Sequence, residues 1–454
     1  MKVSFKKIRL KSKEERRFRQ GHPWVFSNEL QESPKHLGMG EVVELHDSGG
    51  AFLAYGFANP HSLISFRELT RDERETGLLP ESVASDFFFS RFEEALRFRR
   101  SWFGEDHSFR LVYGEADGLS GLIIDRFRGE NQCVYVVQPH SAGMDRNLDS
   151  IVEALAGLEP SLGERVAVLR RDAASREKEG IPREAVRIID LKSRREFSGS
   201  EPMVLEQIGR FRFRVPGIMG SVITLSADLA SGQKTGFFFD QLQNIRLLET
   251  LLLRKLKNDR VLNSRSHEFS VLDLCSYVGQ WSAHLVQPLA EREALPAEFV
   301  CVDASEAALK FAQENVRAVA DSSGASVKVR VRTLQTDVLG ALPGVADRSF
   351  DVVIADPPAF IKSRKSLPQG KQAYVQLFQT AISKVRPGGL VVCCSCSQLL
   401  GTEEFKEILG KASRRSGRKV RWIAEGAPSV DHLIRLEFQE GHYLKCRIAQ
   451  VDSV

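Results

Sequence analysis

The sequence predicts an α/β protein in which a large parallel sheet follows a small β-barrel and a central α/β region. Two observations lead to this prediction. From about residue 202 onward, short apolar runs alternate with helical patterns, which is typical of βαβ units with helices on both faces of a parallel sheet. Between Val3 and about Arg71, short strands instead alternate with turns such as Asp47-Ser-Gly-Gly50, as in a barrel built from hairpins.

Composition narrows the class of protein. The 454 residues are 42% hydrophobic and 27% charged, which suits a soluble globular protein of two or three domains. No apolar run approaches the roughly 20 residues that cross a bilayer, and the N-terminus lacks the apolar core of a secretion signal. Seven cysteines without a regular framework suit a reducing compartment. We therefore expect a cytoplasmic protein with no membrane partner.

Positive charge is concentrated at the N-terminus. Residues 1–20 contain nine Lys or Arg and two Glu, whereas the whole chain has a net charge of only +5. A basic arm of this kind is typical of a surface that contacts phosphates. A solvated terminal tail has the same composition, so charge alone leaves both interpretations open.

The barrel is predicted from aromatic and alternating segments. Turn residues separate these segments, and each is rich in residues that favour strands. The expected strands lie within residues 21–28, 40–45 and 51–58.

The central region begins with a helix. Residues 85–103 have helical periodicity, and residues 109–126 contain two strands around a glycine-rich turn. Asp117 and Asp125 belong to that segment, and we expect turn or strand-end roles for them rather than metal binding. The highly charged stretch 171–201 is expected to be a surface segment or linker.

In the last region, from about residue 202, the predicted strands and helices alternate regularly. Ser305 is predicted to cap a helix, with Glu306 in its first turn. The expected strands are 270–275, 299–303, 327–334, 352–355 and 389–396, and helices are expected at about 243–255, from about 280 and at about 371–384.

One stretch in this region, Asp351–Phe360, is central to the prediction. Its apolar run, Val352–Ala355, suits a fully buried parallel strand. A carboxylate and two prolines follow, so Asp356 is expected at the carboxyl end of a central strand, where ligands bind in open α/β sheets. The next strand ends at Cys396, and we expect both side chains to face one pocket.

Acidic residues end four successive strands: Asp273, Asp303, Asp337 and Asp356. The first strand passes through a turn, Asp273–Gly279, into a helix, which is a nucleotide-type arrangement. The turn lacks the G-x-G-x-x-G of a pyrophosphate site, which favours a ligand without phosphates. Asp303 would accept from a ribose diol and Asp337 from an adenine amino group. Each acid alone would more often be a cap or turn residue, so the ordered set carries the prediction.

Several segments together resemble a known family. GHPWVFSNEL, SGQKTGFFFDQLQNIRLL, VLDLCSYVGQWS, DVVIADPPAFIKSRKS, PGGLVVCCSCS and DHLIRLEFQEGHYLKCRI are similar to segments of the bacterial 23S rRNA cytosine-C5 methyltransferases with an N-terminal PUA domain. The resemblance spans nearly the whole chain. It implies a PUA-like RNA-binding β-barrel at 1–72, a central α/β domain and linker at 73–200, and a class I, Rossmann-like methyltransferase domain at 201–454. It also implies S-adenosylmethionine as cofactor and 5-methylcytosine as product.

The resemblance further implies roles for individual residues. Cys396 and Asp356 match the catalytic thiol and acid of the family. The implied cofactor-binding residues are Phe239, Gln241, Asp273, Ser276, Tyr277, Gly279, Asp303, Ala304, Asp337, Asp356 and Pro357. Val278 and the pair Gln280-Trp281 depart from the family's usual Thr and Gly-Phe, and residues 256–268 look like an insertion.

The expected chemistry supports a thiol. C5 of cytosine is a poor nucleophile, and addition of a thiolate at C6 makes it enamine-like. The base must be unpaired or flipped, and the thiol needs a positive or dipolar neighbour that the sequence does not identify. Cys394 and Cys396 would share one face of the strand, Cys393 would point the other way, and Cys396 lies nearest the tip. With no second Cys pair, we expect no metal.

Two other functions stay open. The Asp-Pro-Pro motif also serves methylation of exocyclic amines of adenine or guanine, which needs no thiol, and a non-catalytic RNA-binding assembly factor is the second alternative. The expected partner is RNA, either 23S rRNA or a large-subunit precursor. Lys362, Arg364 and Lys365 would contact it or form a solvated loop. The residues leave the oligomeric state, a homodimer included, undetermined.

Overall fold

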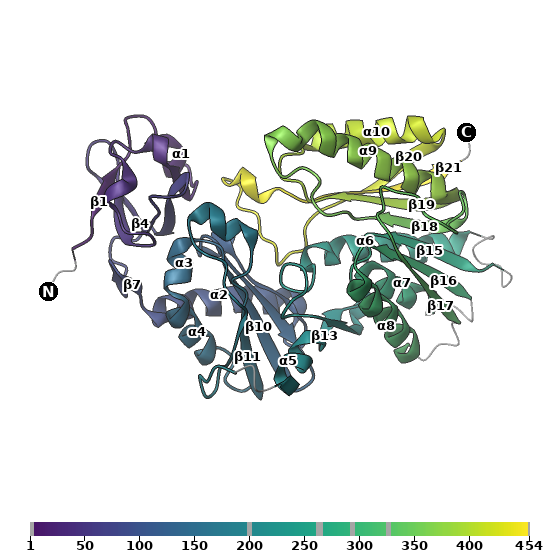
Figure 1. The fold of residues 1–454 in the computed structure, drawn as a ribbon, viewed down its shortest axis with the longest axis horizontal. Coiled ribbons are helices and arrows are strands. Elements are labelled where there is room, and N and C mark those ends of the chain that lie inside the picture. The colour runs from purple at the N-terminus through teal and green to yellow at the C-terminus, as the bar shows by residue number, and fades with distance from the viewer. Residues whose placement is uncertain (1–3, 198–201, 260–266, 291–295, 324–327, 453–454) are drawn as a thin grey trace. The chain divides into compact units, whose positions relative to one another are not determined.

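The computed structural model describes most of the chain as two compact units (Figure 1). The described residues are 4–197, 202–259, 267–290, 296–323 and 328–452. The first unit comprises Met1–Arg214, Asp228–Phe239 and Val430–Gly441, and the second comprises Val215–Ala227, Asp240–Ser429 and His442–Val454. Part of the expected insertion at 256–268 lies outside the described residues, as do residues 198–201 of the expected linker.

The first unit begins with a five-stranded sheet in the order β1-β3-β4-β5-β2. Its elements are β1 (Lys7–Arg9), α1 (Glu15–Arg19), β2 (Trp24–Phe26), β3 (Val42–His46), β4 (Phe52–Ala58) and β5 (Ile64–Thr70). The three strands expected in this region are confirmed as β2, β3 and β4. Phe18, Val25, Leu45 and Phe66 are among the side chains of a closed apolar core, which explains the alternating pattern of the strands.

The central part of the first unit is a second five-stranded sheet, in the order β12-β11-β10-β9-β8. Its strands and helices are β8 (Phe109–Tyr113), β9 (Leu122–Arg128), β10 (Gln132–Pro139), β11 (Glu164–Leu169), β12 (Arg187–Asp190), α2 (Ser85–Phe103), α3 (Ala142–Arg146) and α4 (Leu148–Gly157). A small hairpin of β6 (Leu78–Leu79) and β7 (Ser82–Val83) precedes α2. The expected helix at 85–103 is confirmed, because Phe88, Phe92 and Leu96 lie on one buried stripe.

The charged stretch expected to be a surface segment or linker is partly structural. It contributes β12, which pairs antiparallel with β11. Arg176 is fully buried and donates to the carboxylate of Asp145 and the carbonyl oxygen of Pro139, at 2.8 and 2.9 Å. Charge runs are usually solvated, but here long-range partners neutralise and bury part of the run.

The second unit is built on a seven-stranded sheet in the order β17-β16-β15-β18-β19-β21-β20. Its strands are β15 (Phe269–Leu274), β16 (Ala297–Asp303), β17 (Val329–Gln335), β18 (Phe350–Ala355), β19 (Val385–Ser395), β20 (Lys419–Gly426) and β21 (Lys445–Asp452). The first five are parallel, and β21 is antiparallel to both of its neighbours. The predicted parallel sheet is therefore confirmed.

Helices cover both faces of this sheet. Figure 1 shows α9 and α10 on one face and α6, α7 and α8 on the other. The helices are α6 (Leu242–Asn258), α7 (Gln280–Ala290), α8 (Glu306–Ser322), α9 (Leu367–Lys384) and α10 (Thr402–Ser416), while α5 (Pro202–Gly209), β13 (Phe211–Pro216) and β14 (Val222–Ala227) precede them. Ser305 caps α8 as expected, since its side chain accepts from the backbone N–H of Ala308 at 3.2 Å. The carboxyl ends of β15, β16, β17 and β18 therefore meet at one edge.

Candidate cofactor and catalytic site

The turn after β15 has an unusual backbone. Cys275, Tyr277 and Gly279 have φ angles of 64°, 48° and 74°, in the left-handed region. A Cβ atom on Gly279 would lie 2.8 Å from the Cα atom of Ala312 in α8. Gly279 is thus required both by its dihedral angle and by the close approach of the next helix.

Asp303 holds this turn against the end of the neighbouring strand. Its Oδ2 accepts from the backbone N–H of Tyr277, and its Oδ1 from that of Ser305, both at 2.9 Å. The carbonyl oxygen of Ala304 accepts from the side chain of Gln335 at 3.2 Å. Asp337 is exposed, and its Oδ1 accepts from the N–H of Leu339 at 2.9 Å.

Asp273 is the most deeply buried acid of the set. Ser282 donates to its Oδ2 at 2.8 Å. Burial raises the pKa of Asp273 to about 7, and the charges of Asp356 and Asp303 add to the increase. The pKa of Cys275 is also raised, first by burial and then by the charges of the four strand-end acids. The acids that were far apart in the sequence therefore converge around one thiol.

The turn also contains buried oxygens that lack a donor. Asp273 Oδ1 and Gln280 Oε1 have no hydrogen-bond partner among the described residues. Buried polar atoms are nearly always bonded, so these oxygens can accept from a ligand such as the ammonium group of S-adenosylmethionine. The residues at this edge fit the cofactor that the resemblance implies.

Asp356 is held on both of its oxygens. Gln241 Nε2 donates to Oδ1 at 2.9 Å, and Trp281 Nε1 donates to Oδ2 at 3.0 Å. Asn244 in turn orients Gln241 through a bond of 2.7 Å. The role of Trp281 was not predicted, although the sequence already marked residues 280–281 as a departure from the family pattern.

Cys396 lies immediately beyond the end of β19, next to the Asp-Pro-Pro stretch. Its Sγ is 3.9 Å from the carbonyl oxygen of Pro357. The following residue, Ser397, is within 2.8 Å of the hydroxyl of Tyr374, and its carbonyl oxygen accepts from Lys445 Nζ at 2.7 Å. The structure thus brings the strand tips carrying Asp356 and Cys396 together, whereas the sequence did not indicate Tyr374 or Lys445.

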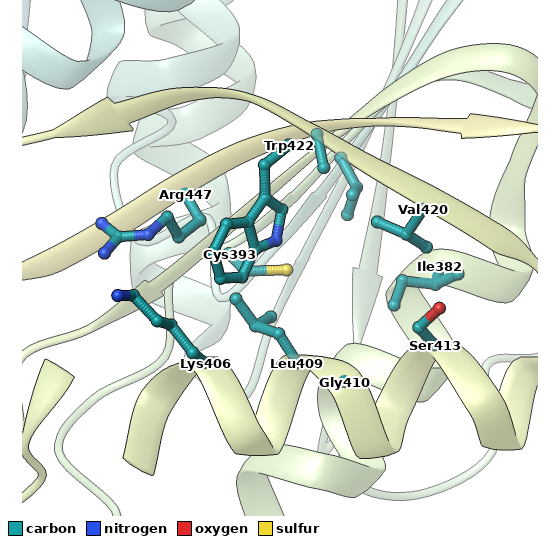
Figure 2. A pocket seen from close by; sticks show the side chains of 11 residues that line it. Ile382, Cys393, Lys406, Leu409, Gly410, Ser413, Val420, Trp422 and Arg447 are labelled. Carbon is teal, nitrogen blue, oxygen red and sulfur yellow. The ribbon is translucent and has the colours of Figure 1, made fainter. Parts of the chain in front are cut away.

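The two other thiols of this strand lie elsewhere. Figure 2 shows Cys393 in a pocket between α10 and the strands β19, β20 and β21, below the ring of Trp422. Cys394 is fully buried, and burial raises its pKa well above the usual range, with Cys446 as the next cause. Neither thiol occupies the tip of the strand.

Phe239 is the one predicted cofactor residue that belongs to the first unit. Its ring is fully buried and packs against Phe127, Phe213 and Phe237, with centroid distances of 5.2, 6.5 and 5.0 Å. In the structure this side chain therefore has a packing role, while Gln241, two residues later, contacts the site.

Across residues 4–452, apart from the gaps given above, no three His, Cys, Asp or Glu side chains gather as a metal site. In the same part of the chain, every helix is too short or too polar to span a bilayer.

Comparison with known proteins supports the fold described above, a PUA-like domain followed by a methyltransferase domain. Residues 8–71 match the model of a PUA-like domain, and residues 250–424 match that of an FtsJ-like methyltransferase. A candidate S-adenosylmethionine-dependent methyltransferase of Streptococcus mutans has the same fold, with a TM-score of 0.67 and 15% identity over 98% of this chain and 100% of that one. A candidate methyltransferase complexed with SAH gives the same values.

Curated relatives cover nearly the whole chain. "Ribosomal RNA large subunit methyltransferase I" of Photobacterium profundum is 31% identical over 95% of this chain and 96% of its own length. The protein of the same name from Citrobacter koseri is 30% identical over 94% and 95%. The fold is that of a class I methyltransferase, and its cofactor is S-adenosylmethionine. More specifically, the chain belongs to the ribosomal RNA large subunit methyltransferase I family.

Proposed function

We propose that this enzyme methylates C5 of a cytosine in large-subunit ribosomal RNA through a covalent bond between Cys396 and C6 of the base. One observation carries the proposal: Cys396 lies beside the Asp-Pro-Pro stretch, with its sulfur 3.9 Å from the oxygen of Pro357. A thiol at the strand tip next to a fixed carboxylate suits covalent catalysis on a pyrimidine. The names of the relatives supply the substrate class, since they act on large-subunit rRNA.

The residues at the carboxyl ends of β15, β16, β17 and β18 would contact different parts of the cofactor. Asp273 would accept from the ammonium group, Asp303 from the ribose and Asp337 from the adenine side, while Ser276, Tyr277 and Gly279 shape the turn. Ala304 and Pro357 would border the ligand through their backbones. S-adenosylmethionine, when bound, supplies an electrophilic methyl group on sulfur.

Cys396 and Asp356 would have separate roles in the reaction. The Cys396 thiolate forms a bond to C6, and the electron pair of the C5–C6 double bond becomes available at C5 for the methyl group. After transfer, a base removes the proton from C5, the double bond re-forms, and the C6–sulfur bond breaks to regenerate the thiolate. Asp356 would hold N3 or N4 of the cytosine, and the donors Gln241 and Trp281 keep its carboxylate in place.

RNA would be bound partly by the N-terminal barrel. Several basic residues of the N-terminal arm pair with acids of the barrel: Lys6 with Glu41, Lys7 with Glu44, Arg17 with Glu29 and Arg19 with Asp47. The proposed phosphate contacts therefore centre on the exposed Lys11, Lys13 and Arg16.

The test is a trapping experiment with 23S rRNA that contains 5-fluorocytidine. Fluorine at C5 prevents the final loss of the proton, so the thioether at C6 persists. We expect a protein–RNA adduct that depends on S-adenosylmethionine and maps by mass spectrometry to Cys396. The attached RNA fragment would identify the target nucleotide.

Two variants act as controls for the trap. Cys396→Ala should form no adduct and transfer no methyl group, whereas Cys393→Ala, in the pocket of Figure 2, should behave like the wild type. Methyl transfer by Cys396→Ala at the wild-type rate would contradict the proposal and favour methylation of an exocyclic amine. An enzyme that neither binds S-adenosylmethionine in calorimetry nor transfers methyl groups would favour an assembly factor.

A further inference from the structure

A buried lysine lies beside the proposed nucleophile. Lys445 is the first residue of β21 and pairs in register with Ser395, the last residue of β19. Only 6% of Lys445 is exposed. The antiparallel pairing therefore fixes an ammonium group next to the point where the chain leaves the sheet toward Cys396.

Main-chain oxygens hold this ammonium group. Lys445 Nζ donates to the carbonyl oxygens of Ser397 and Tyr443, each at 2.7 Å. An ammonium group has three N–H donors, so these two bonds leave one donor for a further partner. The Cys396 thiol is close enough to act on Lys445 electrostatically: burial lowers the pKa of Lys445 to about 8, and the charge of Cys396 opposes that decrease.

The effect must be mutual. If a thiolate at Cys396 favours the charged form of Lys445, the charge of Lys445 favours the thiolate to the same extent. With a pKa of about 8, Lys445 is mostly protonated at neutral pH. A buried cation acts through a low-dielectric medium, so its influence on a neighbouring thiol is larger than that of a surface lysine.

Three other titratable groups lie on the elements around this strand tip, and none of them carries a positive charge. Tyr374, on α9, contacts Ser397, and its pKa is raised first by burial and also by the charge of Cys396. Asp356, after β18, is an acid and disfavours a second negative charge. Tyr443 donates to Asp240 at 2.5 Å, which makes this pair neutral or negative.

We propose that Lys445 is the positioning residue that ionises Cys396, by holding a fixed positive charge beside the thiol at the tip of β19. The inference rests on the proposed role of Cys396 and extends it to the group that activates the thiol. An apolar residue in place of Lys445 would remove this buried positive charge, and the neutral form of the thiol would be favoured more.

The test is the pH dependence of alkylation of Cys396 by iodoacetamide, in full-length protein without RNA or cofactor. Fragmentation of the peptide that contains all three thiols of β19 and its tip reports modification at Cys396 alone. In the wild type, the midpoint should lie below the ordinary thiol value of about 8.5. In Lys445→Met it should rise by about one pH unit, with a roughly tenfold slower reaction at pH 7.

Two further variants separate charge from packing. Lys445→Arg keeps the charge and should keep the low midpoint. Arg418 is another buried cation, 4% exposed, that donates to the carbonyl oxygens of Asp452 and Val385. Arg418→Met should therefore lower stability, as Lys445→Met does, without moving the midpoint.

Several results would overturn the inference. A wild-type midpoint at or above about 8.5 would do so without any variant, even if Lys445→Met did not fold. A folded Lys445→Met with the wild-type profile would do the same. Because alkylation needs neither RNA nor methyl transfer, a normal 5-fluorocytidine adduct with an unshifted midpoint would refute the role of Lys445 alone. A shifted midpoint without any adduct would refute the proposed covalent reaction alone.

Discussion

Acidic side chains have different hydrogen-bonding partners in the two large sheets. In the central sheet of the first unit, Asp125 accepts two bonds from Arg110, at 2.8 and 2.9 Å, and Asp117 is paired with the fully buried Arg99. In the second unit, the strand-end acids accept bonds from uncharged groups: a serine hydroxyl, backbone N–H groups, an amide and an indole.

This difference separates the acids with structural partners from those proposed to bind the cofactor or the base. A guanidinium that binds both oxygens of a carboxylate neutralises it and leaves little for a ligand to gain. A carboxylate held by uncharged donors is not neutralised by a cation and keeps lone pairs that can accept from a ligand. Asp117 lies in a turn as expected, whereas Asp125 lies in the middle of β9 rather than at the expected strand end, because its carboxylate is paired with Arg110 across the sheet.

The sharpest test of the comparison exchanges charge for an amide in each sheet. Asp356→Asn should reduce methyl transfer by a factor on the order of 10²–10⁴, with only about 1 kcal/mol lost from the free energy of unfolding. Asp125→Asn leaves Arg110 without its buried partner and should cost about 3–5 kcal/mol of stability. Urea unfolding and single-turnover kinetics measure the two effects. Equal losses of stability in both variants would break the comparison.

The uncharged donors around Asp356 can be tested next. Trp281→Phe retains the ring but removes the N–H that donates to Asp356, and should lower kcat about tenfold with KM for RNA unchanged, because one hydrogen bond to a charged group is lost. Trp422→Phe, in the pocket of Figure 2, is the matched control and should leave kcat unchanged. If both variants have the wild-type kcat, the indole does not position Asp356.

Burial of Asp273 without a cation predicts a dependence of stability on pH. Its pKa of about 7 lies above the ordinary value of 3.8, so the folded state binds the proton more tightly than the unfolded state. This contribution to stability is complete below about pH 4 and is lost as the pH rises through about 7. The melting temperature of Asp273→Asn minus that of the wild type should therefore increase between pH 5 and pH 8. A constant difference would show that Asp273 is not protonated in the folded state.

The smallest expected effect is on RNA binding, and it concerns exposed cations in the loop after the Asp-Pro-Pro stretch. Lys362 and Arg364 are exposed, shortly after the Asp-Pro-Pro stretch. If they contact phosphates, Lys362→Ala with Arg364→Ala should weaken RNA binding and reduce the slope of log K against log salt by about 1–2. The exposed pair Lys411 and Arg414 on α10 provides a control double variant. An unchanged slope in the first variant would mean that this loop is only solvated.

The sequence predicted those parts of the structure that depend on neighbouring residues. The helix at 85–103, the cap at Ser305 and the strand that ends before Asp356 follow from local periodicity and capping, and all three are confirmed. The convergence of the strand-end acids also followed, since parallel strands place their carboxyl ends at the same edge.

The contacts that complete the site could not be predicted from the sequence, because they join residues that are far apart in the chain. Trp281 and Asp356 are 75 positions apart, and Lys445 and Ser397 are 48 apart. Phe239 was expected at the cofactor, but its fully buried ring packs among phenylalanines of the first unit. Partners of this kind are fixed by tertiary packing, which a local pattern does not contain.

The position of β21 has a consequence for synthesis of the protein. This strand lies between β19 and β20, yet its residues are translated after those of every other strand in the sheet. The first unit also waits for a late segment, since Phe438 packs against Trp24 with a centroid distance of 4.7 Å. Until β21 joins the sheet, the edge of β19 that pairs with it stays open. The sheet of the second unit therefore cannot close between β19 and β20 before this last strand has been synthesised.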